Sequence, residues 1–204
     1  MRVIYNGELK SIDDVPASSS GWLDSEGIFE TIKSVGNKPF SLSRHIARAQ
    51  SSAVALGITI PNSDQISQGV SDLFAAVPHG LGMLRISFDN QGNWLAVHMP
   101  YAEQEKSCDV RTHPDAVTGD VHKRFPYTNR LEILEQARLA GFDDAIVVNS
   151  QGNICEGSVT NLIANIDGRW VTPPTTDVVL PGIIRQILIE NELVAIESIP
   201  ADRL

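Results

Sequence analysis

Short runs of strand-forming residues, divided by turn dipeptides, open the first half of the chain. Asn6-Gly7 separates two such runs near the N-terminus, and Gly36-Asn37 separates two more within residues 27–42. Turn dipeptides between strand-like flanks are typical of β-hairpins, because these residues adopt the backbone angles that a tight turn needs. Residues 82–100 show a third such pattern. The sequence therefore predicts three hairpins before residue 101.

Apolar residues at helical spacing follow the second predicted hairpin. Ile46, Ala49, Ala53 and Leu56 recur every three or four positions, and Gly57 provides a stop. This spacing places the apolar side chains on one face of an amphipathic helix. Helices are predicted over residues 43–58, 63–77, 130–141 and 180–193, and a run of strands over residues 143–174. Hairpins that alternate with separate helices indicate an α+β fold.

A polar segment without an apolar period, residues 101–112, separates the two halves. We interpret it as an interdomain linker, in which strand character resumes near Val110. It joins an N-terminal α+β domain over residues 1–100 to a C-terminal α+β domain over residues 113–204. A chain of 204 residues can bury one substantial core or two small ones, so this length accommodates two small domains.

The overall charge narrows the class of function. A formal net charge of -9 argues against a protein that binds nucleic acid or anionic membranes, because such proteins carry basic patches. No apolar run is long enough to span a membrane, and the N-terminus lacks the apolar core of a signal peptide. Neither Cys108, Cys155 nor any histidine shows metal-ligand spacing, so no metal site is predicted. These features predict a cytoplasmic protein whose two cysteines are free thiols.

Four features of the sequence together fit one cofactor. Lys123 supplies an amine just before the third predicted helix, and Glu156 supplies a carboxylate between apolar segments. Gly182 opens a helix whose N–H groups favour an anion such as phosphate, and Arg48 offers a cationic fork. Pyridoxal 5′-phosphate requires an amine, a carboxylate for its ring nitrogen and a phosphate cradle. On this interpretation a protonated pyridine offsets the cost of burying Glu156. Taken singly, each feature is more typical of a solvated charge, a turn or an ordinary helix start.

The chain as a whole resembles the class IV (fold type IV) pyridoxal-phosphate-dependent aminotransferase family, and it is most similar to the 4-amino-4-deoxychorismate lyases within it. Two stretches carry the resemblance: "DSEGIFETIKSVGNKPFSLSRHIARAQSSAVALGI" and the segment from "HKRFPYTNRLE" to "LPGIIR". The resemblance implies a two-domain fold like that of D-amino acid aminotransferase, with the cofactor in the interdomain cleft. It also implies a homodimer in which the partner's first domain completes the substrate pocket, and an amino-acid-like substrate.

The resemblance also assigns roles to residues. Lys123 matches the lysine that condenses with the cofactor's aldehyde and carries protons, and Thr31 matches a substrate-side threonine of the lyases. These two are the predicted catalytic residues, and Glu156 matches the partner of the pyridine nitrogen. The other predicted cofactor-binding residues lie at the phosphate (Arg48, Gly182, Ile183, Ile184), at the ring (Tyr127, Leu180) and along the pocket (Ser158, Val159, Thr160, Asn161).

The chain departs from the family pattern at several places. "RFPY" follows Lys123 in place of the usual sequels, and a register anchored on "NRLE" would place Pro126 at the lysine position. The spacing to "GFDD" favours Lys123. "DSEG" replaces Tyr-Gly-Asp-Gly, and "RISFDNQGNW" lacks the "TRG" often found after that strand. This absence weakens the D-amino acid aminotransferase interpretation, since those enzymes use basic residues near there to bind the substrate carboxylate. The chain stops at "IPADRL", where family members usually continue, so we expect a C-terminal domain that is shortened at its end.

Three functions remain open at this point. The first is a lyase that releases 4-aminobenzoate and pyruvate from 4-amino-4-deoxychorismate in folate biosynthesis, favoured by Thr31 and by the resemblance of the second half to lyases. The second is a class IV aminotransferase acting on branched-chain or D-amino acids. The third is a non-catalytic, metabolite-binding relative. Loop residues of the pocket decide between the first two, and the sequence alone does not place those loops.

Overall fold

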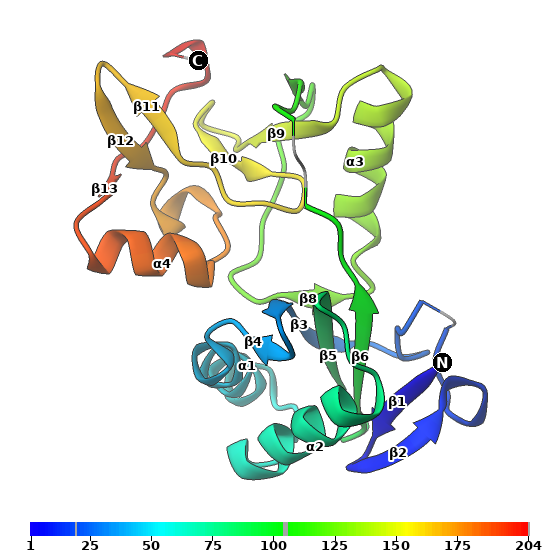
Figure 1. Cartoon of the computed structure of the whole chain (residues 1–204). Helices are drawn as coiled ribbons and strands as arrows, with labels where there is room; N and C mark the ends of the chain where they lie inside the picture. The colour runs from blue at the N-terminus through cyan, green and yellow to red at the C-terminus, as the bar shows by residue number, and fades with distance from the viewer. Residues whose placement is uncertain (19, 104–105, 204) are drawn as a thin grey trace. The chain divides into compact units, whose positions relative to one another are not determined.

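The computed structural model describes residues 1–18, 20–103 and 106–203 and divides the chain into two compact units. Unit 1 comprises Met1–Gln104 with Lys123–Pro126, and unit 2 comprises Glu105–His122 with Tyr127–Leu204. Residues 104 and 105, inside the predicted linker, lie outside the described residues. Hairpins and separate helices make up the units (Figure 1), which confirms the predicted α+β class.

Unit 1 is built on a seven-stranded sheet. The strand order is β2-β1-β6-β5-β3-β4, with β8 paired to β3, and every pair is antiparallel. The pairs β1–β2, β3–β4 and β5–β6 confirm the three predicted hairpins. The strands are β1 (Arg2–Tyr5), β2 (Glu8–Ser11), β3 (Gly27–Val35), β4 (Lys38–Pro39), β5 (Leu81–Asp89), β6 (Trp94–Pro100) and β8 (Arg124–Phe125).

Helices α1 (Leu42–Leu56) and α2 (Ser63–Ala76) cover one face of this sheet (Figure 1), as their apolar spacing predicted. Ile28 of β3 and Ile46 of α1 belong to the same buried core. Side chains alternate along a strand, so Glu30 also lies on the helix-covered face, whereas Phe29 and Thr31 lie on the other face. The two faces of β3 therefore carry different chemistry.

Unit 2 contains two three-stranded sheets, ordered β10-β9-β7 and β11-β12-β13. Ile133 and Ala137 of α3 share a core with Val147 and Cys155 of the first sheet. Strand β7 begins at Val110, where strand character was expected to resume. The elements are β7 (Val110–Thr112), α3 (Thr128–Leu139), β9 (Asp144–Val148), β10 (Ile154–Gly157), β11 (Ala164–Ile166), β12 (Arg169–Thr172), α4 (Ile183–Glu190) and β13 (Ala195–Ile196).

Short 3-10 helices complete the described elements, over Ile12–Asp14, Thr175–Asp177 and Ala201–Arg203. None of the helices within the described part of the chain has the length and apolar character needed to cross a membrane. The two cysteines, Cys108 and Cys155, are free, as predicted.

Candidate functional site

Lys123 is placed by the pairing of β8 with β3. The N–H of Phe29 donates a 2.8 Å hydrogen bond to the Lys123 carbonyl, and β8 then continues antiparallel along Gly27 and Ile28. The ammonium of Lys123 lies 4.6 Å from the centre of the Phe29 ring, within the range of a cation–π interaction. The side chain is half-buried. The amine is therefore fixed over an aromatic ring on the face of β3 that the helices do not cover.

Two further residues on this side of unit 1, Trp22 and Arg85, were not predicted. Trp22 meets Phe29 edge to face, with ring centres 4.8 Å apart, and the Arg85 guanidinium stacks 3.9 Å from the Trp22 ring. Arg85 of β5 is the cross-strand partner of Thr31, which brings a cation next to the predicted catalytic threonine. Only the register between β3 and β5, strands separated in sequence by two helices, reveals this pair.

Part of the Arg85 guanidinium is hydrogen-bonded within the protein. Its Nη1 donates to the carbonyl of Ser20 at 3.0 Å, while its Nε is buried without a hydrogen-bond partner among the described residues. Burial lowers the pKa of Arg85 from its usual value. A guanidinium nevertheless stays charged in proteins, so Arg85 offers a fixed positive charge and a buried, unpaired donor.

Arg48, the predicted phosphate ligand, lies on the opposite side of β3. Its Nε and Nη2 donate to the two carboxylate oxygens of Glu30 at 2.9 and 2.5 Å, and His45 Nδ1 lies 2.6 Å from Glu30 Oε2. Burial alone would raise the pKa of Glu30, but the hydrogen bonds from His45 and Arg48 outweigh it and lower that pKa. The Arg48 fork is thus held by a buried carboxylate, and its phosphate contact stays a prediction.

Glu156, at the end of β10, is 6 % exposed and receives several donors from unit 2. Arg130 Nη2 donates to Oε1 at 3.0 Å, whereas Asn161 Nδ2 and the Leu180 N–H each donate to Oε2 at 3.1 Å. A guanidinium partner and additional hydrogen bonds offset the cost of burying a carboxylate. Arg130 was missed because nothing local to "NRLE" distinguishes it from an exposed arginine at a helix start.

The turn after Glu156 is organised by Asp144. The Gly157 N–H donates to the Thr160 carbonyl at 2.7 Å, and the hydroxyls of Ser158 and Thr160 both donate to the Asp144 carboxylate. Val159 is exposed at the tip of the turn. Two of the hydroxyls predicted to line a cofactor pocket therefore brace the turn, and their contact with a cofactor stays a prediction.

The start of α4 packs against the turn that follows Glu156. Gly182 is the N-cap of α4, and no side chain caps it. A Cβ atom at Gly182 would lie 1.7 Å from Asn161 Oδ1, so only glycine allows this approach. Asn161 also donates to the Leu180 carbonyl at 3.0 Å, which ties the turn to the segment that enters the helix. The predicted phosphate residues Ile183 and Ile184 form the first positions of α4.

The residues present have the chemistry that pyridoxal 5′-phosphate needs. Unit 1 carries the Lys123 amine. Unit 2 carries the buried Glu156 carboxylate, paired with Arg130, and the start of α4 at Gly182, where a Cβ atom would not fit. Tyr127, the predicted neighbour of the ring, is the half-buried N-cap residue of α3. Within the described ranges, no group of three or more His, Cys, Asp or Glu side chains could hold a metal ion.

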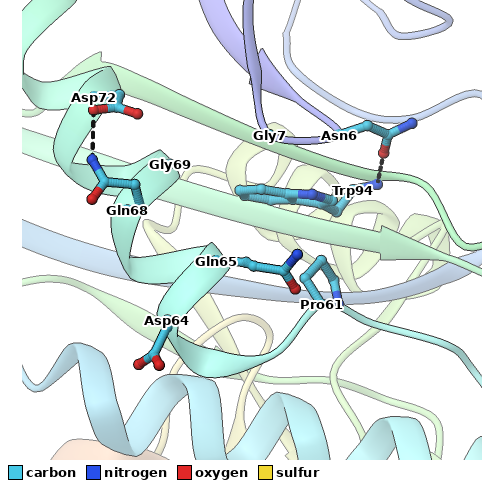
Figure 2. A pocket seen from close by; sticks show the side chains of 9 residues that line it. All are labelled: Asn6, Gly7, Pro61, Asp64, Gln65, Gln68, Gly69, Asp72 and Trp94. Carbon is cyan, nitrogen blue, oxygen red and sulfur yellow. Dashed lines mark hydrogen bonds between the residues drawn. The ribbon is translucent and has the colours of Figure 1, made fainter.

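A pocket of about 510 Å³ in unit 1 involves none of the predicted site residues (Figure 2). It lies where α2 passes the start of β6, and the indole of Trp94 forms part of its wall. Gly69 packs against this indole, since a Cβ there would lie 2.6 Å from the ring. The lining residues are Asn6, Gly7, Pro61, Asp64, Gln65, Gln68, Gly69, Asp72 and Trp94.

Comparison with known proteins matches residues 27–204 to the model of the amino-transferase class IV family. A putative branched-chain-amino-acid aminotransferase of Methanocaldococcus jannaschii is 28% identical, over 93% of this chain and 74% of that protein. The structure of a putative 4-amino-4-deoxychorismate lyase from Legionella pneumophila superposes with a TM-score of 0.77 at 25% identity, covering 88% of this chain and 75% of that one. The family, the fold type and the cofactor predicted from the sequence are thereby confirmed.

One further solved structure bears on the cofactor. It is a branched-chain amino acid aminotransferase complexed with N-(5′-phosphopyridoxyl)-L-glutamate, with a TM-score of 0.82 at 20% identity. The match covers 100% of this chain and 78% of that one. At this identity the likeness concerns the fold, and the cofactor adduct is a property of that protein.

Proposed function

The chain belongs to the class IV aminotransferase family, whose members are pyridoxal-phosphate-dependent aminotransferases or lyases, and we propose that it cleaves 4-amino-4-deoxychorismate to 4-aminobenzoate and pyruvate. The observation that carries this proposal is the arrangement on the face of β3 that the helices do not cover. There, Thr31 shares a face with Phe29, the ring that holds the Lys123 amine, and has Arg85 as its cross-strand partner. An amine, a hydroxyl and a cation are thus offered to an anionic substrate from one side of unit 1.

The proposed reaction is a β-elimination that needs neither an oxidant nor an acceptor. Pyridoxal 5′-phosphate, when bound, would hold the substrate amine covalently and delocalise the electron pair that remains when the α-proton leaves. Lys123 takes that proton as general base. The C–O bond to the enolpyruvyl group then breaks, the ring becomes aromatic, and the released enolpyruvate gains a proton to become pyruvate. Thr31 donates a hydrogen bond on the substrate side, and Arg85 faces the substrate's carboxylate.

Residues of unit 2 serve the cofactor on this proposal. Glu156 would accept a hydrogen bond from the pyridine nitrogen, Leu180 would pack against the ring, and the N–H groups of Ile183 and Ile184 would bind the phosphate. The same phosphate role is proposed for Arg48, which belongs to unit 1. The buried position of Glu156 and the close approach of Gly182 support these roles. The family resemblance further suggests a cytoplasmic homodimer that serves folate biosynthesis.

A class IV aminotransferase is the second candidate, and one observation favours it. The 28% identical relative that aligns with 93% of the chain is a putative branched-chain-amino-acid aminotransferase. Both candidates use the same cofactor and the same lysine. They differ in whether the reaction requires a keto acid as amino-group acceptor, which makes them separable by assay.

The test supplies purified protein and pyridoxal 5′-phosphate with 4-amino-4-deoxychorismate in the absence of any keto acid, and measures pyruvate. The lyase proposal predicts one pyruvate per 4-aminobenzoate, loss of both products in Thr31→Ala, and their recovery in Thr31→Ser. A parallel reaction supplies leucine or a D-amino acid with 2-oxoglutarate or pyruvate and measures transfer of the amino group. If the amino group is transferred to the keto acid, and no pyruvate is released when the keto acid is left out, the protein is an aminotransferase and not a lyase. Absence of both activities would favour the non-catalytic alternative.

A further inference from the structure

The buried ion pair between Arg130 and Glu156 bears on how strongly Glu156 can bind the ring nitrogen of the cofactor. Arg130 is 9 % exposed and Glu156 is 6 % exposed, and one guanidinium nitrogen of Arg130 lies 3.0 Å from Glu156 Oε1. The other terminal nitrogen, Nη1, is buried and has no hydrogen-bond partner among the described residues. The two residues come from α3 and β10 of the same unit.

The ion pair between Arg130 and Glu156 is expected to add little to the free energy of unfolding. Desolvation of two charges consumes most of the attraction between them, and an apolar pair of similar volume often stabilises a protein as well or better. The unpaired Nη1 adds to this cost, because a buried donor without an acceptor loses its bonds to water. The pair therefore calls for an explanation in terms of what it does to Glu156.

The geometry divides the surroundings of Glu156 into two sets. Asn161 and the Leu180 N–H hold one oxygen, Oε2, and fix the plane of the carboxylate, whereas Arg130 contacts the other oxygen, Oε1. A second buried guanidinium, Arg185, donates instead to Thr172 Oγ1 and the Pro173 carbonyl. Arg130 thus supplies a full positive charge in direct contact with the carboxylate.

We propose that Arg130 is a positioning residue that shares the negative charge of Glu156, so that the ring nitrogen of bound pyridoxal 5′-phosphate meets a partly neutralised carboxylate. The inference rests on the assignment of Glu156 to the ring nitrogen in the proposed function. A carboxylate that already binds a guanidinium attracts a pyridinium N–H less strongly than a lone buried carboxylate would. Removal of Arg130 leaves the Glu156 carboxylate without its guanidinium partner. A protonated ring nitrogen then contributes more to the binding of the cofactor.

The experiment isolates the ring nitrogen by using two probes. Apoprotein is titrated with pyridoxal 5′-phosphate and with its 1-deaza analogue, in which a C–H replaces the ring nitrogen, and the ratio of the two Kd values is taken. In Arg130→Met this ratio, deaza over natural cofactor, is expected to rise at least about tenfold over the wild type, which corresponds to about 1.4 kcal/mol. Buried charge pairs commonly couple by this much or more.

Two variants and one control keep the test decisive. Arg130→Gln retains a neutral donor and is less disruptive to folding, and its ratio is also expected to rise. Arg130→Lys retains the charge, so its ratio should return toward the wild-type value. Arg138→Met removes an exposed arginine from the last turn of the same helix and should leave the ratio unchanged.

A ratio in Arg130→Met and Arg130→Gln within about twofold of the wild type, a difference of roughly 0.4 kcal/mol, would overturn the inference. The same ratio does not depend on which reaction the protein catalyses. Failure of the pyruvate assay would therefore remove the lyase and leave this test intact. A wild type whose two Kd values are equal would contradict both the role of Glu156 at the ring nitrogen and the role of Arg130 behind it.

Discussion

Replacement of Glu30 by glutamine is expected to destabilise the protein strongly, because Glu30 joins α1 to β3 through two basic side chains. Glu30 is 3 % exposed and accepts hydrogen bonds from Nε and Nη2 of Arg48. His45 Nδ1 lies 2.6 Å from the same carboxylate. Glutamine preserves the volume but removes the charge. The substitution removes the buried negative charge that both Nε and Nη2 of Arg48 contact.

The magnitude follows from this geometry. Removal of one partner of a buried ion pair costs about 3–5 kcal/mol, and the lower end applies here because Arg48 is half-buried and glutamine can still accept a hydrogen bond. For a chain of this size each kcal/mol lowers Tm by about 2–4 °C, so a decrease of roughly 6–12 °C is expected at neutral pH.

The pH dependence gives the prediction a sign. The pKa of Glu30 is lowered in the folded protein, so its contribution is fully present above the unfolded value of about 4.3 and is lost as pH falls through the lower folded pKa. The Tm difference between wild type and Glu30→Gln should therefore be largest at neutral pH and shrink below about pH 4.

Thermal unfolding followed by circular dichroism measures this difference, with Glu103→Gln as the matched control. Glu103 pairs with Lys33 on the surface, and exposed pairs contribute about 0–1 kcal/mol. The Glu30 variant should therefore lose much more stability than the control. Equal Tm values for Glu30→Gln and wild type at pH 7, or a difference that grows as the solution is acidified, would contradict a stabilising role for the Glu30 charge.

Two further predictions concern unit 2. Gly182→Ala forces a Cβ to within 1.7 Å of Asn161 Oδ1, so a loss of about 1–3 kcal/mol in stability and a weaker Kd for pyridoxal 5′-phosphate are expected in denaturant and cofactor titrations. Burial raises the pKa of Cys155 to about 11, so its thiol stays protonated at pH 8 and only exposed Cys108 should react rapidly with a disulfide reagent. Two rapid thiols in the native protein would contradict this.

Local patterns in the sequence account for most of the secondary structure. Turn dipeptides at Asn6-Gly7 and Gly36-Asn37 mark hairpins because few residues adopt the positive φ angles found there. Helix α1 ends at Gly57 for the same reason, with φ +68°. These signals lie within a few residues of the features they specify, which is why they could be recognised without a structure.

The pairs that organise the candidate site could not be predicted in this way. Arg130 with Glu156, and Thr31 with Arg85, join segments that are far apart in the sequence and become neighbours only through sheet register and helix packing. Arg48 was expected at a phosphate, but its contact with Glu30 depends on which face of β3 the helix covers. Sequence patterns indicated which residues carry chemistry, and the fold determined their partners.

Reductive trapping tests whether Lys123 binds pyridoxal 5′-phosphate covalently. Protein incubated with pyridoxal 5′-phosphate is treated with borohydride, digested, and mapped by mass spectrometry, with Lys123→Ala as the control. We predict loss of the visible absorption band and a phosphopyridoxyl mass on the peptide that contains Lys123, and neither change in the variant. A modification on another lysine, or none in the wild type, would contradict the assignment of Lys123 as the residue that binds the cofactor covalently.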